Sequence, residues 1–194
     1  MPIAKFLLAS ASRKSAIGNW KSAMNNVWHF DPAYSTVEFV VRNFWYNVKG
    51  HFKEMEGVIV LDEDDVSRSS VTATIKARSI DTGNKRRDAH LVSREFLDVD
   101  NHADIEFQST SVRRGRDRDS LDLEGNLTIK NKRVPITLAV NEMDRSRSPN
   151  GEEFIYYSAI TEIDRFAFGI NYGRGLMGRF LKVTINVQAS NMHR

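Results

Sequence analysis

From Trp28 almost to the end of the chain, apolar and polar residues alternate with a period of two. In one such row, polar residues separate Val71, Ala73, Ile75 and Ala77. Similar rows lie at 37–41, 48–52, 105–107, 121–129, 134–140 and 183–187. Successive side chains of a strand point to opposite faces, so this period predicts strands with one wet and one buried face. Such strands belong to antiparallel sheets, because strands of parallel sheets read as continuous apolar runs.

Turn signals separate these rows. Asp62–Ser70 and Arg113–Ser120 are polar or charged, and Asn150-Gly151 is a strong hairpin dipeptide. One segment, Arg86–Leu97, instead has apolar residues near helical spacing, and it predicts a short helix between two strands. About eight strands with little helix and no repeat leave either a closed barrel or a two-sheet sandwich.

The size of the inward residues helps to choose between these architectures. The row from Val71 to Ser79 contains Ala73 and Ala77, small side chains that would face rows rich in leucine and phenylalanine. A filled sandwich core needs large side chains throughout, whereas a barrel of about eight strands can leave room for a ligand. The sequence therefore favours a barrel with vacant volume, although small residues can also lie opposite bulky ones.

Charge and cysteine content exclude several functions. The net charge of +3 comes from residues 1–30, which contain Lys5, Arg13, Lys14 and Lys21 and no acidic residue. The rest of the chain is balanced, whereas a nucleic-acid-binding domain normally has a basic face, so no nucleic-acid partner is expected. The absence of cysteine excludes disulfides, thiolate metal sites and cysteine nucleophiles.

Residues 1–26 have a loose helical period and predict an N-terminal extension, helical in part, before a single domain at 27–194. The extension is either an appendage without further role or a cationic helix that contacts a membrane surface or covers one end of the domain. Its longest apolar run, Phe6–Ala9, is shorter than the core of a secretory signal, typically ~7–15 residues. A cytoplasmic location is expected, with the periplasm, secretion or an organelle as alternatives.

Five segments resemble the YceI-like, or polyisoprenoid-binding, family, and they occur in order over roughly residues 28–190. They are WHFDPAYSTVEFVVRN (28–43), VKGHFKEMEGVIVLDE (48–63), SIDTGNKRRDAHLVSREFLDVDNHADIEFQST (79–110), LEGNLTIKNKRVPITLAV (123–140) and TEIDRFAFGI (161–170). The most specific piece is the series Thr82, Arg87, Asp88, His90, Leu91 and Phe96.

The resemblance implies an all-β fold, a lipocalin-like antiparallel barrel of eight strands with a short helix. It also implies an elongated apolar pore that holds a polyisoprenoid, such as an isoprenoid quinone or its precursor, and no other cofactor. The chain departs from the family pattern at Tyr34-Ser35, Ala103 and Met177-Gly178-Arg179, where the family usually has His-Ser, proline and Val-Gly-Asp. These positions lie at strand ends, where a lipid head group would emerge.

The inward rows supply the candidate pore residues. They are Val37, Phe39, Val41, Phe52, Val71, Ala73, Ile75, Phe107, Leu121, Leu123, Leu127, Ile136, Leu138, Val183 and Ile185. From the pattern alone these residues are more simply explained as a core that packs against itself, and the resemblance reverses that preference.

The cluster Arg87, Asp88 and His90 could be catalytic, but a structural role is favoured. Asp88 can cap the short helix, and Arg87 and His90 can hold the crossing loop by hydrogen bonds. An enzyme acting on an apolar substrate, with His90, Asp88 or Tyr34 as acid or base, remains the alternative to a lipid carrier or store. A polar residue midway down the pore would favour the enzyme, whereas the inward polar residues, chiefly Ser35 and Ser79, lie near strand ends.

No metal site is expected. The five histidines lack the spacing that presents two ligands on one face, and Asp62–Asp65 lacks the glycine and spaced ligands of a calcium loop. The glycines of Gly169–Gly175 fit neither nucleotide fingerprint and predict tight turns. The exposed-looking run Phe44–Tyr46 could guard a barrel mouth, enter a membrane interface, or form core and homodimer contacts.

Overall fold

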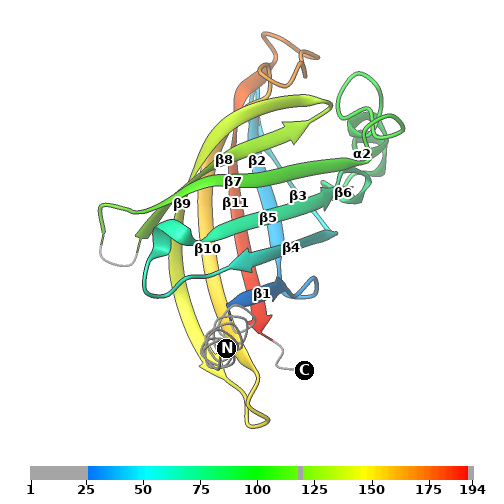
Figure 1. Ribbon diagram of the computed structural model, residues 1–194. Coiled ribbons are helices and arrows are strands. Elements are labelled where there is room, and N and C mark those ends of the chain that lie inside the picture. Colours follow the sequence, from blue (N-terminus) through cyan, green and yellow to red (C-terminus); the bar gives the residue numbers. More distant parts are fainter. Residues whose placement is uncertain (1–25, 118–119, 192–194) are drawn as a thin grey trace, which may run out of the picture.

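The computed structural model describes residues 26–117 and 120–191 (Figure 1). In this part of the chain almost all regular structure is β-strand. The strands are β1 (Val27–Phe30), β2 (Thr36–Asn43), β3 (Tyr46–Phe52), β4 (Met55–Val60), β5 (Ser70–Lys76), β6 (Ile80–Asp81), β7 (Asp104–Arg114), β8 (Ser120–Ile129), β9 (Lys132–Arg147), β10 (Glu153–Asp164) and β11 (Met177–Asn191). The helical elements are the α-helix α2 (Lys85–Leu91) and the 3₁₀ turns η1 (Val66–Arg68) and η2 (Ala77–Ser79).

These segments close into an eight-stranded antiparallel barrel, as expected. β1 and β2 follow one another along the same partner, with Phe30 opposite Ala189 and Val37 opposite Ile185 of β11. β3 and β4 pair with β2 and β1 in the same way, and β6 and β5 pair with β3 and β4. The eleven segments therefore make the eight strands of the barrel wall, which we call staves. Three staves consist of two segments each, and each stave pairs with the next in sequence.

The interruptions let the sheet fold over itself. Figure 1 shows β4, β5 and β7 crossing steeply in front of β10 and β11. The stave made of β1 and β2 breaks at residues 31–35, and the adjacent stave breaks between β3 and β4 at residues 53–54. Bends at such corners are how strands pass from one face of an orthogonal barrel to the other. The apolar faces of all eight staves consequently enclose one interior.

The predicted helix is present but shorter than Arg86–Leu97, because α2 ends at Leu91 and the chain continues in turns. In these turns the Leu97 N–H donates to the Leu91 carbonyl at 3.1 Å, and Phe96 and Leu97 are buried. Turns rather than a helix therefore bring both side chains to the core.

The prediction that Asp88 caps this helix is wrong. The cap is Asn84, whose side-chain oxygen accepts the backbone N–H groups of Arg86 and Arg87, each at 3.1 Å. The Asp88 carboxylate instead accepts the backbone N–H of Thr82 at 3.0 Å and the Thr82 hydroxyl. Asp88 lies too far into the first turn to serve as the cap.

The predicted turns are confirmed. Asn150-Gly151 joins β9 to β10, and Gly151 has φ +90°, a region that glycine enters without steric cost. Asp62–Ser70 contains η1, and Arg113–Ser120 runs from the last two residues of β7 to the first residue of β8. Within the described ranges, none of the helices has both the length and the apolar character needed to cross a bilayer. The predicted extension at 1–26 lies almost wholly outside the described residues.

Candidate functional site: an apolar cavity inside the barrel

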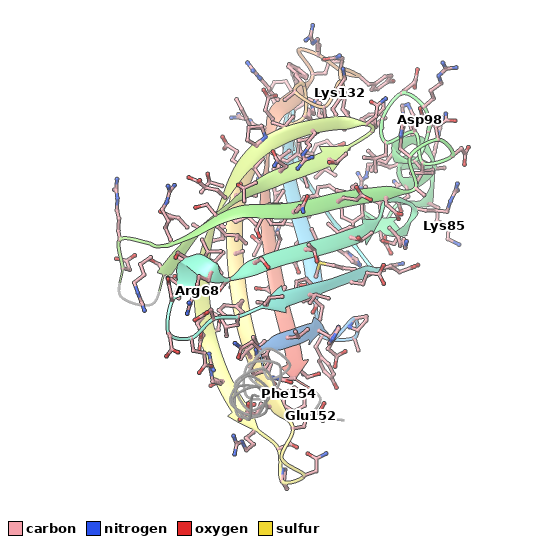
Figure 2. The ribbon with its side chains drawn as sticks, viewed as in Figure 1. Arg68, Lys85, Asp98, Lys132, Glu152 and Phe154 are labelled. Carbon is pink, nitrogen blue, oxygen red and sulfur yellow. The ribbon has the colours of Figure 1, made fainter. Side chains whose placement is uncertain are left out.

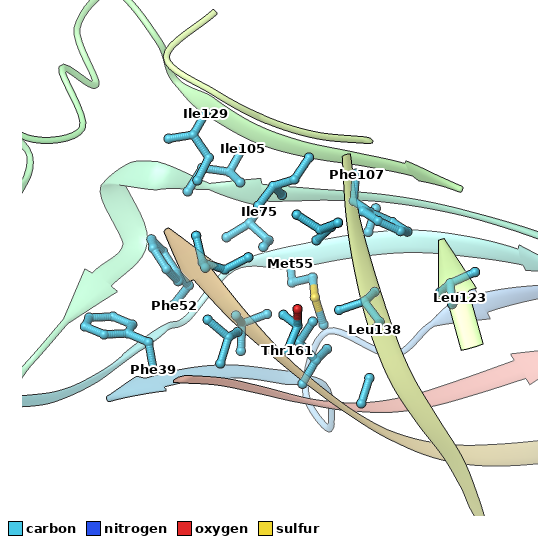
Figure 3. Close-up of a pocket in the computed structure, with 18 of the residues that line it drawn as sticks. Phe39, Phe52, Met55, Ile75, Ile105, Phe107, Leu123, Ile129, Leu138 and Thr161 are labelled. Atoms are coloured by element: carbon cyan, nitrogen blue, oxygen red, sulfur yellow. The ribbon is translucent and has the colours of Figure 1, made fainter. Parts of the chain in front are cut away.

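The barrel encloses a cavity that reaches towards both of its ends. Its volume is about 260 Å³. Val66 of η1 lines it just before β5, and Leu91 of α2 lines it just after β6. Because β5 and β6 form one stave, these two residues mark opposite ends of the cavity. Figure 3 shows apolar side chains such as Phe39, Phe52 and Ile75 pointing into it.

All fifteen pore residues predicted from the alternation line this cavity. Of the series that carries the family resemblance, Leu91 and Phe96 also line it. Thr82, Arg87, Asp88 and His90 do not belong to the lining. The alternating pattern therefore located the wall of the cavity, and the specific motif lies at its end.

One strand of the wall, β10, was not predicted from the sequence. Tyr157, Ala159, Thr161 and Ile163 line the cavity at a spacing of two, which is the signal that would have found them. The outward residue Ile160 obscured it, because its side chain is apolar although 43 % exposed. Further lining residues that were not predicted include Phe30, Met55, Ile59, Leu61, Arg165, Phe168 and Leu181.

Three glycines let phenylalanine rings lie flat against the wall. A Cβ atom added to Gly50 would overlap the ring of Phe39. In the same way, a Cβ on Gly57 would overlap Phe30, and one on Gly125 would overlap Phe107. All three rings line the cavity. Each missing side chain thus provides a seat for a ring that would otherwise project further into the interior.

We expect Gly125→Ala to push the Phe107 ring into the cavity and to destabilise the fold by about 1–3 kcal/mol, the usual cost of overpacking. Urea unfolding measures the loss. Ala substitution at Gly83 would not serve as a control, because the Gly83 φ of +73° would strain an alanine. The matched test is instead the double variant Gly125→Ala/Phe107→Leu, which lacks the ring that the added Cβ would displace. Partial recovery of the lost stability is expected in the double variant, because the added Cβ would still lie 2.7 Å from the backbone carbonyl oxygen of Gln108. No recovery at all would contradict a specific role of Gly125 in accommodating the Phe107 ring.

A buried arginine closes the α2 end of the cavity. Arg165 is 3 % exposed and lines the cavity. Its guanidinium donates to the carbonyls of Ile170 and Tyr172, each at 2.7 Å, to that of Gly178 at 2.8 Å, and to that of Met177 at 3.1 Å. One side chain therefore ties the β10–β11 loop back onto the start of β11.

The charge of Arg165 is balanced by carbonyl dipoles rather than by a carboxylate of its own. Burial, and next the nearby Arg174, lower the pKa of the Arg165 guanidinium. The adjacent Asp164 pairs instead with Arg179, at 2.7 Å. A positive group in this setting depends on its hydrogen bonds, because a buried charge without partners is strongly disfavoured.

We expect the Asp164–Arg179 pair to make stability fall at low pH. The hydrogen bond from Arg179, and the backbone N–H of Phe166, lower the pKa of Asp164. A carboxyl whose folded-state pKa is depressed contributes stability above its unfolded pKa of about 3.9, and loses it as the pH falls through the folded value. Urea unfolding as a function of pH should therefore show a shallower acid slope for Asp164→Asn than for the parent. Equal slopes would contradict this expectation.

A polar cluster lies at the η1 end. The Tyr157 hydroxyl donates to Glu142 at 3.0 Å, and Arg145 Nε donates to the same carboxylate at 3.2 Å. Arg145 also pairs with Glu63 in the loop before η1. Burial and the Glu142 charge raise the pKa of Tyr157. Tyr157 is thus a protonated phenol near neutral pH, and it supplies no base to the cavity.

The motif residues hold the crossing loop. Arg87 Nε donates to the Thr82 hydroxyl at 2.7 Å, and its Nη2 donates to the Thr82 carbonyl at 2.9 Å. The His90 Nε2 atom lies 2.6 Å from a carboxylate oxygen of Glu95. The His90 ring meets the rings of Phe96 and Tyr172 edge to face. These contacts agree with the structural interpretation of Arg87 and His90. Among the described residues, no cluster of histidine and acidic side chains is arranged to hold a metal ion.

Comparisons with known proteins agree with this architecture. The YceI-like domain family matches residues 28–189. The protein YceI of Salmonella arizonae is 32 % identical over 156 residues, which cover 80 % of this chain and 81 % of the relative.

Solved structures share the fold. Burkholderia cenocepacia BcnA superposes with a TM-score of 0.74 at 20 % identity, covering 82 % of this chain and 98 % of that one. The Campylobacter jejuni YceI protein gives 0.69 at 26 % identity, covering 75 % and 85 %. A polyisoprenoid-binding domain from Saccharophagus degradans gives 0.62 at 12 % identity, covering 84 % and 97 %.

Proposed function

We propose that this chain, which belongs to the family of YceI-like domains, binds one long apolar lipid in its barrel and acts as a carrier or store for it. The observation that carries the proposal is the wall of the cavity, which is formed mainly by apolar side chains from the α2 end to the η1 end. The ligand class that we propose is a polyisoprenoid, such as an isoprenoid quinone or its precursor. The name of the Saccharophagus domain, which shares the fold, is consistent with this class.

The energetics support a carrier with little polar recognition. Each buried methylene contributes about 0.8 kcal/mol, so a long prenyl chain can be held by its hydrocarbon alone. The polar groups in the wall are occupied by the protein itself. The Thr161 hydroxyl donates to the Thr137 carbonyl at 2.8 Å, and the Tyr157 hydroxyl donates to Glu142. We therefore expect tight binding with loose selectivity for the head group.

An enzyme in the same cavity has less support. The three candidate acid or base residues, His90, Asp88 and Tyr34, do not line the cavity. His90 faces Glu95, and Asp88 is engaged by Thr82. Tyr34 is 67 % exposed. None of the three reaches a substrate held inside the barrel, and we propose no catalytic activity.

Native mass spectrometry of the purified protein tests the proposal. A co-purifying lipid near one per chain is expected, and organic extraction of the complex should release a prenyl compound. The same protein, stripped of lipid and incubated with a prenyl quinone in detergent, should take up one molecule per chain. A protein that is isolated empty and takes up no added quinone would overturn the proposal.

A further inference from the structure

An apolar patch lies on the surface at the end of the barrel where β2 meets β3. Within the described residues it consists of Phe44 and Trp45 in the β2–β3 turn, Tyr46 at the start of β3, Leu176 in the β10–β11 loop and Phe180 in β11, and we name it the end patch. Trp45 is 86 % exposed. Large apolar side chains gathered on a surface commonly mark a contact site, whereas single exposed ones need no explanation.

The end patch is one connected surface. The Phe44 N–H donates to the Leu176 carbonyl at 3.0 Å, which joins the two loops. The rings of Phe44 and Trp45 meet edge to face with centroids 4.6 Å apart. Asn43 is paired with Met177, so the turn and the start of β11 are neighbours in the sheet.

Basic side chains surround the end patch. The two segments that form it, 42–49 and 165–182, contain no acidic residue. Their basic residues are Arg42, Lys49, Arg165, Arg174, Arg179 and Lys182. All of these except the buried Arg165 are exposed. Arg179 also pairs with Asp164, and Lys182 lies opposite Glu162 of β10. Lys132, the first residue of β9, lies at the same end of the molecule (Figure 2).

The end patch borders the cavity. Met177 lines the cavity, while the preceding Leu176 points outward and is exposed. Leu181 and Val41 also line it, beside the outward Phe180 and Arg42. A surface that contacts the end patch therefore lies next to the α2 end of the cavity, which Arg165 and the β10–β11 loop close.

We propose that the end patch docks on an anionic lipid bilayer, which gives the carrier a site at which its ligand enters and leaves. Tryptophan and tyrosine favour the interface between water and hydrocarbon, because their rings are apolar with one polar edge. Lysine and arginine near an anionic leaflet each strengthen attraction to it. A second copy of the chain is a poorer occupant, since the same basic residues would then face one another. This inference rests on the proposed lipid-binding function.

Vesicle flotation tests the docking. The parent protein should bind vesicles of mixed phosphatidylcholine and phosphatidylglycerol, should bind pure phosphatidylcholine more weakly, and should be released by salt. Trp45→Glu should lower the partition coefficient for the anionic vesicles about tenfold, because it removes an interfacial ring and adds a repelled charge. Trp45→Tyr should retain most of the binding.

Tyr34→Glu is the matched control. Tyr34 is also an exposed aromatic residue, but it lies before β2 whereas Trp45 lies after it, so the two occupy opposite ends of that strand. Equal losses for Trp45→Glu and Tyr34→Glu would overturn the docking site. So would a dimer in light scattering that Trp45→Glu converts to monomer, because a second copy would then cover the end patch.

Uptake of prenyl quinone from detergent separates the two proposals, because it requires no bilayer. If the parent takes up quinone but does not float with anionic vesicles, the docking inference fails and the lipid-binding function stands. If it takes up no quinone, the lipid-binding function fails, and the docking inference falls with it.

Discussion

Replacing Arg165 by methionine should destabilise the protein by roughly 3 kcal/mol or more. The substitution keeps an apolar chain of similar length but leaves four carbonyl groups without their donor. Each buried polar group that loses its partner costs about 1–3 kcal/mol, and partial exposure of the loop to water will recover some of this cost. Urea unfolding at neutral pH, followed by circular dichroism, measures the change.

Two variants make this result specific. Arg165→Lys keeps the charge but has fewer donors in a different geometry, so it should fall between the parent and Arg165→Met. Arg179→Met removes a neighbouring exposed guanidinium, and its effect should stay below about 1 kcal/mol. If Arg165→Met is no more costly than Arg179→Met, the loop is not held by the Arg165 guanidinium.

Replacing Ala73 by phenylalanine should reduce the affinity for a long prenyl chain about a hundredfold. Ala73 lines the cavity, and the added ring would occupy the space of several ligand methylenes. At about 0.8 kcal/mol for each methylene, four of them correspond to roughly 3 kcal/mol, which is about a hundredfold in the dissociation constant. Titration of the lipid-free protein with a prenyl quinone in detergent, followed by native mass spectrometry, measures the loss.

Ala139→Phe is the control for this variant, because Ala139 lies on β9 with its side chain exposed. It should leave binding unchanged. Ala159→Phe blocks the same cavity from β10 and provides a second test if Ala73→Phe does not fold. Unchanged affinity in both blocking variants, with the parent still binding, would place the ligand outside the cavity.

The sequence predicted the strands that have a clean period of two, because alternation is a local consequence of strand geometry. This is why all fifteen proposed pore residues lie in the wall. β10 escaped because Ile160 and Tyr156 are large residues on its outer face, which leaves little contrast with Tyr157 and Ile163. The pairing of β10 with β9 and β11 determines which of these residues face the cavity. Such pairing joins distant parts of the chain, so it cannot be predicted from the local pattern.

The α2 region shows a second limit. Leu91, Phe96 and Leu97 have helix-like spacing, yet turns after Leu91 bury the last two. The role of Arg165 was also beyond local reasoning. Its acceptors lie 5 to 13 residues further along the chain, and only the path of the β10–β11 loop brings their carbonyls to one guanidinium. Polar networks that depend on loop geometry leave no periodic trace in a sequence.

The hollow interior also has a thermodynamic consequence. An unfilled cavity of about 260 Å³ forgoes roughly 6 kcal/mol of packing at about 24 cal/mol per Å³. A guest that fills it takes the place of missing core side chains, and at a thousandfold excess over its dissociation constant its binding stabilises the fold by about 4 kcal/mol in total. Under the proposed function, the melting temperature would therefore depend on the bound lipid as well as on the sequence, and depletion of that lipid in the cell would shorten the lifetime of the barrel.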